Sequence, residues 1–461
     1  MDFEALYLRL PWYVQNVAAS VAGWRIQRNR FDNRFKSIFN KLQGHTSWST
    51  KQMFAFRDER LKTFIHHCVK SVPYYRKLFL ELDINPEEIN TLQDLRRIPV
   101  LKKKDVQMHY QQMLSEDVPQ DEKFIAHTSG TTGGGLRFAV TTMAVQEQWA
   151  VWWRYRFWHE LKMNKWCGYF GGRSVVSLSQ DAPPFWRYNI PGKQIIFSGY
   201  HMSQDNMPAY VDCLRKKKPP WLHGYPSLLA LLSEYMIDVG CDLGYAVNWI
   251  TTGAENLLPQ QAILIEKAFG VKPRQHYGMA EAVANFSECT CGKLHVDEDF
   301  AAVEFLPNDD GVSYRVVGTN FTNPATPLLR YDVGDNVILD KGSCSCGRPG
   351  RIVARVDGRK EDYVILKNGA RIGRMDHIFK DMINIREAQI YQKHRGEIFL
   401  RIVRANHYSQ KDEEILLAET IKRVGDNTLI HLEYVRNMER SKTGKLRFVV
   451  SELDEGKIEM S

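Results

Sequence analysis

The sequence feature that most constrains this chain is a glycine-rich loop at residues 128–135, Thr-Ser-Gly-Thr-Thr-Gly-Gly-Gly, which follows the apolar residues Phe124-Ile125-Ala126. Glycine and hydroxylated residues disfavour helix and strand interiors, because glycine is conformationally free and hydroxyls compete for backbone hydrogen bonds. They allow a backbone to approach an anion, with hydroxyl and N–H groups facing its oxygens. No Gly-Lys-Ser/Thr closes the loop, so it is not a Walker P-loop. The alternative is a flexible surface loop without a ligand. Only the other motifs of the chain can distinguish an anion-binding loop from such a surface loop.

The length and composition of the chain are those of an ordinary globular enzyme with more than one domain. At 461 residues it exceeds one typical hydrophobic core, which predicts two or three domains. Hydrophobic residues make up 44% and charged residues 25%, both usual for globular proteins. The formal net charge of +8 is small for this length. It favours an anionic ligand or an acidic membrane face, and we expect no nucleic-acid partner.

The N-terminal segment and the cysteines predict a cytoplasmic protein. The segment lacks the basic start, long apolar centre and cleavage site of a signal peptide, and no apolar run approaches the length of a membrane-spanning helix. Eight cysteines without a secretion signal indicate a reducing compartment. Trp12, Tyr13 and Trp24, together with Arg25 and Arg28, could make peripheral membrane contact. Packing on the protein itself is the alternative.

Hydrophobic periodicity predicts an α/β fold. Residues 56–79 are expected to be helical with a stop at Pro73, and residues 141–163 to form a long helix with a buried aromatic face. Strand–helix alternation follows, as is typical of an α/β core. Strands are expected at residues 193–200 and 247–255, and a helix at residues 226–240.

The succession of these segments predicts two domains. A large N-terminal domain of mixed sheets and helices precedes a small, self-contained α+β domain. Short strands separated by turn sequences dominate after residue 300. The predicted boundaries are 1–357 for the large domain, with a helical part at 1–120, a core at 121–285 and a β-rich, cysteine-containing part at 286–357, and 358–461 for the small domain.

Five further segments place charged or aromatic residues beside glycine turns. Each has an ordinary structural interpretation when taken singly, because such turns and terminal basic loops are common. Their order and spacing are more informative than any one of them. They are 251-TTGAENL-257, with Glu255; 276-HYGMAEA-282, with Tyr277, Gly278 and Glu281; 327-PLLRYDVGD-335, with Arg330 and Asp335; 357-DGRKEDYVILKNGARIG-373; and 439-ERSKTGKLRF-448, with Lys445.

Together with the glycine loop, these segments resemble the adenylate-forming superfamily of acyl-CoA synthetases, nonribosomal adenylation domains and luciferases. The likeness is to its phenylacetate–CoA ligase and CapK-like branch, and it extends from about residue 60 to the end of the chain. It implies the adenylate-forming enzyme fold, with nucleotide and acyl group bound by residues 121–285 and a mobile C-terminal lid. It also implies an AMP-forming acid–thiol ligase, which uses ATP to convert a small carboxylic acid to an acyl-adenylate and then forms a thioester with CoA.

The resemblance also implies roles for individual residues. A carboxylate attacks the α-phosphate of ATP, so catalysis is mostly neutralisation and alignment of two anions. Lys445 matches the lysine that bridges these two anions, and Glu281 matches the ligand of Mg²⁺. Asp335 matches the carboxylate that binds the ribose hydroxyls, with Arg359 beside it. The β- and γ-phosphates are assigned to Thr128 and Thr131, as catalytic hydroxyls, and to Ser129, Gly130, Thr132 and Gly133; the adenine is assigned to Gly253, Ala254, Glu255, Tyr277 and Gly278.

Three positions depart from the superfamily's pattern. Ala280 replaces the threonine of a Tyr-Gly-x-Thr-Glu motif, so the hydroxyl usually offered to the α-phosphate is missing. Glu361 replaces an aspartate of the Gly-Arg-x-Asp-Asp hinge, which we expect to be tolerated. The glycine loop runs on to Arg137 without the usual Pro-Lys or Pro-Thr. Arg137 could supply the missing cation, or the loop could be looser, so these departures bear on ATP affinity more than on reaction type.

The paired cysteines predict a structural zinc site. Cys289 and Cys291 form one Cys-x-Cys-Gly segment, and Cys344 and Cys346 form another. Such turns can direct two thiolates each onto one tetrahedral cation, and four soft ligands select Zn²⁺ and leave no open position for catalysis. His295 could replace one thiolate. Free thiols or a disulfide are the alternative.

The acid is the least determined part of the prediction. In relatives, the acyl pocket corresponds to residues 168–174 and 221–227 and to the Gly253 turn. Aromatic side chains there favour a planar or aromatic acid, whereas cations could pair with a polar one. The aromatic side chains are Tyr169, Trp221 and Tyr225, and the cations are Arg173 and His223.

The acceptor and the biological setting also stay open. CapK resemblance implies capsule or surface-polysaccharide biosynthesis, in which an amide or ester synthetase could pass the adenylate to an amine or a sugar instead of CoA. A non-catalytic scaffold, degenerate at Ala280, is a second alternative, and a membrane-attached transferase is a third. The oligomeric state is left open.

Overall fold

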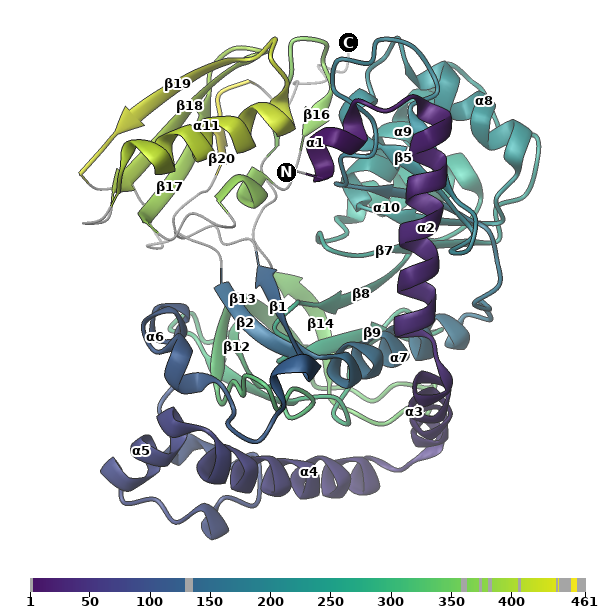
Figure 1. Cartoon of the computed structure of the whole chain (residues 1–461). Coiled ribbons are helices and arrows are strands. Elements are labelled where there is room, and N and C mark those ends of the chain that lie inside the picture. Colours follow the sequence, from purple (N-terminus) through teal and green to yellow (C-terminus); the bar gives the residue numbers. More distant parts are fainter. Residues whose placement is uncertain are drawn as a thin grey trace.

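The N-terminal region of the computed structural model is helical (Figure 1). The structure describes residues 3–128, 136–357, 363–372, 375–379, 384–404, 408–436, 438 and 449–453. Its first helices are α1 (Phe3–Leu8), α2 (Trp12–Arg30), α3 (Asn33–Gly44), α4 (Thr50–Ser71), α5 (Pro73–Glu81) and α6 (Lys103–Met108). The helix expected at residues 56–79 is two helices, because Pro73 ends α4 and begins α5. Proline lacks the N–H that a helix interior needs but suits a first turn.

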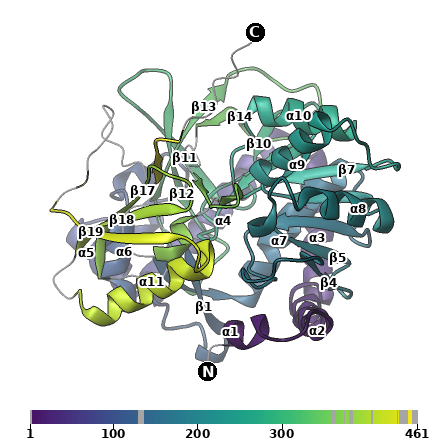
Figure 2. The same ribbon diagram turned by 90° about the horizontal axis from the view of Figure 1, so that it is seen from above.

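A twelve-stranded sheet forms the centre of the molecule, in the order β11-β12-β13-β14-β10-β9-β8-β7-β6-β3-β5-β4. The strands β3, β5, β6, β7 and β8 are parallel, and β4 is antiparallel at their edge. Helices α8 (Met207–Lys217), α9 (Pro226–Asp238) and α10 (Pro259–Phe269) pack beside this half (Figures 1 and 2). The strands of this half are β3 (Cys167–Gly171), β4 (Trp186–Asn189), β5 (Gln194–Ser198), β6 (Trp221–Gly224), β7 (Trp249–Thr252) and β8 (Arg274–Gly278).

The other half of the sheet is antiparallel and begins where β8 pairs with β9. Its strands are β9 (Asn285–Glu288), β10 (Leu294–Val296), β11 (Ala302–Pro307), β12 (Tyr314–Thr319), β13 (Tyr331–Asp340) and β14 (Ile352–Asp357). A separate hairpin of β1 (Lys123–Thr128) and β2 (Leu136–Thr141) carries the glycine loop, since Thr128 pairs with Leu136.

The C-terminal region forms a second sheet with its own apolar core. The strand order is β19-β18-β17-β20, and α11 (Gln410–Val424) packs against it. Arg423 Nη1 donates a hydrogen bond of 2.9 Å to the Tyr200 hydroxyl of the preceding region. The predicted fold class, α/β with an α+β unit at the C-terminus, is confirmed. The strands are β15 (Val364–Ile365), β16 (Arg371–Ile372), β17 (Ile385–Gln392), β18 (Glu397–Arg404), β19 (Leu429–Tyr434) and β20 (Val449–Ser451).

Helix α2 runs along the β4 edge of the sheet and contacts it closely. A Cβ on Gly23 would lie only 1.8 Å from Asn189 Oδ1, so glycine is needed for this approach. The opposite side of the helix exposes Tyr13, Val17 and Trp24. Among the described residues, none of the helices is long and apolar enough to cross a membrane. Peripheral membrane contact stays a prediction.

The long helix expected at residues 141–163 is α7 (Thr142–Trp158), and a buried ion-pair network holds it in place. Thr141 begins the helix by accepting a hydrogen bond from the Ala144 N–H. Arg154 donates to Asp299 Oδ2 at 2.5 Å and to Asp297 Oδ1 at 2.7 Å. Asp299 also contacts His45 Nδ1 at 2.7 Å. Burial alone would raise the pKa of Asp299, but the Arg154 charge outweighs it and lowers that pKa well below its usual value.

Replacing Arg154 with leucine should destabilise the fold strongly. The substitution leaves two buried carboxylates without their cation, which costs about 3–5 kcal/mol. Arg97→Leu is the matched control, because it breaks an exposed pair with Glu88 and should cost less than about 1 kcal/mol. Urea denaturation measures both free energies of unfolding. Similar losses in the two variants would show that the network does not fix α7.

Candidate functional site

A cavity of about 700 Å³ lies at the carboxyl ends of the parallel strands. Its walls come from α2, α7, the residues that end or follow β3, β6, β7 and β8, and residues of β13 and β14. Ligands of open α/β sheets bind at this edge, because the loops after parallel strands converge there. The cavity is therefore the candidate active site.

The turn after β7 contributes one wall of the cavity. Gly253, Ala254 and Glu255 all line it, as predicted for an adenine-binding turn. A Cβ on Gly253 would lie 2.8 Å from His276 Cε1, and Ala254 adopts a left-handed φ of +67°. Glu255 Oε2 accepts a 3.2 Å hydrogen bond from the Ser227 N–H, which lies in the first turn of α9. The turn is thus held against both a neighbouring strand and a helix N-terminus.

Two of the predicted motifs, 58 positions apart, meet in the same wall. The Tyr277 hydroxyl donates to Asp335 Oδ2 at 2.9 Å. One face of the Tyr277 ring stacks on Phe286, with centroids 4.6 Å apart and an interplanar angle of 18°. Gly278 and Glu281 line the cavity as well. The structure therefore brings together the residues predicted for the adenine, the ribose and the Mg²⁺ ion.

The remaining predicted site residues lie outside the described part of the chain. Two described residues next to these segments nonetheless line the cavity. His127 directly precedes the glycine loop, and Val356 is separated from the predicted hinge only by Asp357. The residues concerned are Ser129, Gly130, Thr131, Thr132, Gly133, Arg359 and Lys445, together with the side chain of Thr128.

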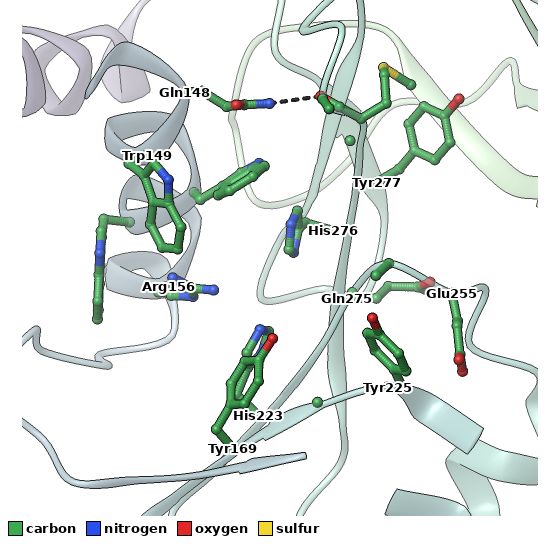
Figure 3. A pocket seen from close by; sticks show the side chains of 18 of the residues that line it. Gln148, Trp149, Arg156, Tyr169, His223, Tyr225, Glu255, Gln275, His276 and Tyr277 are labelled. Atoms are coloured by element: carbon green, nitrogen blue, oxygen red, sulfur yellow. Dashed lines mark hydrogen bonds between the residues drawn. The ribbon is translucent and has the colours of Figure 1, made fainter. Parts of the chain in front are cut away.

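Sequence reasoning missed the face that α7 presents to the cavity. Trp149, Trp152 and Arg156 line it, although the aromatic residues of this helix were interpreted only as core. Figure 3 shows Trp149 and Arg156 on this helix. The spacing of the three residues by three and four positions puts them on one helical face, and this spacing could have identified them. Gln148 Nε2 donates to the Met279 carbonyl at 2.8 Å and ties the helix to the loop after β8.

Two histidines between α7 and the strands are neutral at ordinary pH. Burial, together with the charge of Arg156, lowers the pKa of His276 to about 3. The same two causes, joined by His276, lower the pKa of His223 well below its usual value. The positive charge at this end of the cavity therefore comes from arginine.

A group of three cysteines and one histidine lies outside the cavity. The ligand atoms of Cys289, His295, Cys344 and Cys346 all lie within 4.8 Å of one another. Cys289 Sγ is 3.7 Å from Cys344 Sγ, and Cys346 Sγ is 3.4 Å from His295 Nε2. All eight cysteines are free.

This group differs from the four-cysteine set predicted from the sequence. Cys291 is exposed and its Sγ contacts the Ser345 hydroxyl at 3.4 Å, so His295 takes its place in the group. The His295 Nδ1 lies 3.2 Å from the Pro349 carbonyl, which directs Nε2 toward the thiols. Cys289 and Cys291 lie in a tight turn, in which the Cys289 N–H donates a hydrogen bond to the Lys293 carbonyl at 2.9 Å and Cys291 is left exposed.

Comparisons with known proteins confirm the resemblance to the adenylate-forming superfamily in its phenylacetate–CoA ligase and CapK-like branch. The family model described as the CapK C-terminal domain matches residues 364–452. Protein CapK of Staphylococcus aureus is 24% identical over 97% of this chain and 99% of its own length. A phenylacetate–coenzyme A ligase of Thermus thermophilus is 27% identical over 69% of this chain and 72% of its own. The crystal structure of a 2-hydroxyisobutyryl-CoA ligase shares the fold, with a TM-score of 0.56, 18% identity and coverage of 88% and 91% of the two chains.

Lowering the pH should destabilise the protein through His276. Its folded-state pKa of about 3 lies below the 6.5 of an unperturbed histidine. The unfolded chain therefore takes up the proton first, and the free energy of unfolding falls as pH drops through this window. His276→Gln should reduce the fall, measured by urea denaturation at about pH 7 and about pH 5. An unchanged pH dependence in the variant would contradict the assignment.

Proposed function

We propose that this chain is an AMP-forming acid–CoA ligase, which activates a small carboxylic acid with ATP and transfers the acyl group to CoA. The observation that carries the proposal is the convergence of the Gly253 turn, Tyr277 and Asp335 in one cavity at the carboxyl ends of the parallel strands. Phenylacetate–coenzyme A ligases among the relatives support the reaction class. The fold shared with 2-hydroxyisobutyryl-CoA ligase supports the domain arrangement, with residues 358–461 as a mobile lid.

In the proposed mechanism the protein aligns and neutralises two anions. The adenine lies in the turn formed by Gly253 and Ala254, with Tyr277 against its ring, and Asp335 accepts hydrogen bonds from the ribose hydroxyls. The glycine loop, attached after His127, holds the β- and γ-phosphates. Lys445 compensates the charge that develops between the attacking carboxylate and the α-phosphate. Glu281 is a carboxylate on the cavity wall, which suits Mg²⁺, and the ion would neutralise phosphate charge there.

The setting and the acceptor are inferred from the relatives. CoA is the acceptor that fits the phenylacetate–coenzyme A ligases, and CapK similarity over nearly the whole chain supports a role in surface-polysaccharide biosynthesis. The free state of all eight cysteines supports a cytoplasmic location. An amide or ester synthetase acting on an amine or sugar remains the rival, and a mass-spectrometric search for the thioester, with and without CoA, separates the two.

Two substitutions test the proposed nucleotide chemistry. Asp335→Asn should weaken ATP binding about tenfold to a hundredfold, since charge-assisted hydrogen bonds to the ribose are lost. Lys445→Ala should leave ATP binding intact and lower acid-dependent pyrophosphate release about a hundredfold or more. Lys442→Ala, in the same basic segment, is the control for Lys445. Calorimetry measures binding, and an enzyme-coupled assay measures pyrophosphate.

The outcomes separate the proposal from its rivals. Undiminished pyrophosphate release in Lys445→Ala would count against the assigned role of this lysine. Absence of ATP binding in the unmodified protein would favour a non-catalytic scaffold, the alternative suggested by Ala280.

We further propose that Cys289, His295, Cys344 and Cys346 bind a structural zinc ion. Three thiols and one imidazole are a typical tetrahedral donor set for Zn²⁺, and their atoms already lie close together. The group links the turn between β9 and β10 to the segment between β13 and β14. With four protein ligands the ion has no open position, so it would stabilise this part of the sheet and take no part in catalysis.

Two serine variants test the ligand set. Cys346→Ser should lose most of the zinc measured by elemental analysis and should lower the melting temperature. Cys291→Ser should keep about one zinc per chain, because the four donor atoms of the group are complete without this exposed thiol. Equal zinc loss in both variants would mean that Cys291 is a ligand and that the proposed set is wrong.

A further inference from the structure

The two ends of the cavity differ in charge. Glu255, Glu281 and Asp335 lie at the end proposed for the nucleotide, and Arg156 lies on the α7 side. Figure 3 shows Arg156 directed toward the space between His276 and His223, with Glu255 across the cavity. Arg30 from α2 and Arg173 after β3 also line the cavity; Arg30 and Arg156 both lie near the Trp149 ring, and Arg173 is close enough to Arg30 for their charges to interact. Three guanidinium groups thus share one end of the cavity.

Of the three arginines, Arg156 gives the clearest indication of an anionic ligand. Its side chain is almost wholly inaccessible, with the residue only 3% exposed, yet its Nε finds no acceptor and it forms no ion pair with a described carboxylate. Arg154, two residues earlier, is also buried, but its charge is compensated in the usual way by two aspartates. A buried guanidinium offers five N–H donors, and leaving it without an anion is costly.

Aromatic rings surround Arg156 but do not replace an anion. The Arg156 Cζ lies 4.9 Å from the ring centroid of Trp153, 5.3 Å from that of Trp221 and 5.9 Å from that of Trp149. Cation–π contacts stabilise the charge through the ring faces but accept no in-plane hydrogen bond. The rings also keep this side chain buried. They therefore strengthen any ion pair that a ligand makes with this guanidinium.

The other two arginines add to the same positive field. Arg30 Cζ lies 4.1 Å above the Trp149 ring. Burial, with the nearby charge of Arg173, lowers the pKa of Arg30 to about 10. Like charges brought this close repel each other in the empty cavity, and an anion between them relieves the repulsion. Neutral His223 and His276 contribute no charge and leave the arginines as the only cations of this end among the described residues.

We propose that the acid substrate carries a second anionic group, a carboxylate, sulfonate or phosphate, which binds Arg156 with help from Arg30 and Arg173. This inference rests on the proposed function for its assignment of the nucleotide end. The reacting carboxylate lies toward Glu281 and the nucleotide, and the second anion lies at the α7 end. The flanking tryptophans then pack on the planar or apolar body that joins the two groups.

The test uses pairs of acids that differ by one anionic group. Phenylacetate is compared with benzene-1,4-diacetate and with 4-sulfophenylacetate, and binding is measured by calorimetry on the full-length protein. The dianionic acids should bind at least about tenfold more tightly than phenylacetate, as one buried charge-assisted pair implies. Arg156→Met should remove this preference, and Arg156→Lys should keep part of it because the charge is retained.

Two further variants test whether a lost preference for dianionic acids comes only from a damaged fold. Arg173→Met changes an exposed side chain and should reduce the preference without loss of the fold. Arg97→Met, outside the cavity, should leave the preference unchanged. ATP affinity should stay the same in the Arg156 and Arg173 variants.

Each result of these binding measurements either supports or overturns the second-anion site. Equal binding of mono- and dianionic acids, or a preference that survives in both Arg156→Met and Arg173→Met, overturns the inference. A loss of ATP affinity in Arg156→Met would assign this arginine to the triphosphate instead and also overturns it. Tight, Arg156-dependent binding of a dianion without any acid-dependent pyrophosphate release supports the second-anion site but rejects the proposed ligase activity.

Discussion

The pairing of Arg154 with Asp297 and Asp299 is the interaction on which the site depends. Residues two apart on a helix point to nearly opposite sides, so fixing Arg154 toward the β9–β11 region fixes Arg156 toward the cavity. Trp149 and Trp152 share the side of Arg156. A single buried network therefore determines which face of α7 a ligand meets. It also explains why a helix with so many aromatic residues serves both the core and the cavity.

The cavity is built from segments that are far apart in the sequence but converge at one edge of the sheet. The parallel strands end there, the β1–β2 hairpin delivers His127 there, and β13 and β14 bring Asp335 and Val356. The change from parallel to antiparallel pairing at β8–β9 places the Tyr277 motif at the junction of the two halves. This arrangement allows a nucleotide at one end and an acid at the other to share one continuous space.

Local parts of the fold could be predicted from the sequence, and their spatial assembly could not. The starts of α7 and α9 lie where the periodicity predicts them, but α7 ends at Trp158 and not at residue 163. The glycine-turn motifs singled out Glu255, Tyr277 and Asp335, which all line the cavity. The sequence allowed His295 to replace one thiolate, but which cysteine leaves the group depends on the fold, and the structure leaves out Cys291. Arg173 was predicted as a possible partner of a polar acid, but Arg30 and Arg156 were missed because the three arginines come from separate elements. Only tertiary structure shows that they line one cavity and that, within the described part of the chain, the Nε atoms of Arg30 and Arg156 have no hydrogen-bond acceptor.

In the proposed arrangement, the placement of α2 would separate recognition of the acid from the chemistry performed on it. The helix supplies Arg30 to the cavity and touches the β4 edge through the close contact of Gly23 with Asn189, whereas the motif residues described at the nucleotide end come from the strands and loops of the sheet. Substitutions along one side of this peripheral helix can therefore retune which acid is accepted while the adenylate-forming end stays unchanged. A family built in this way can diversify its substrates by exchanging an outer helix.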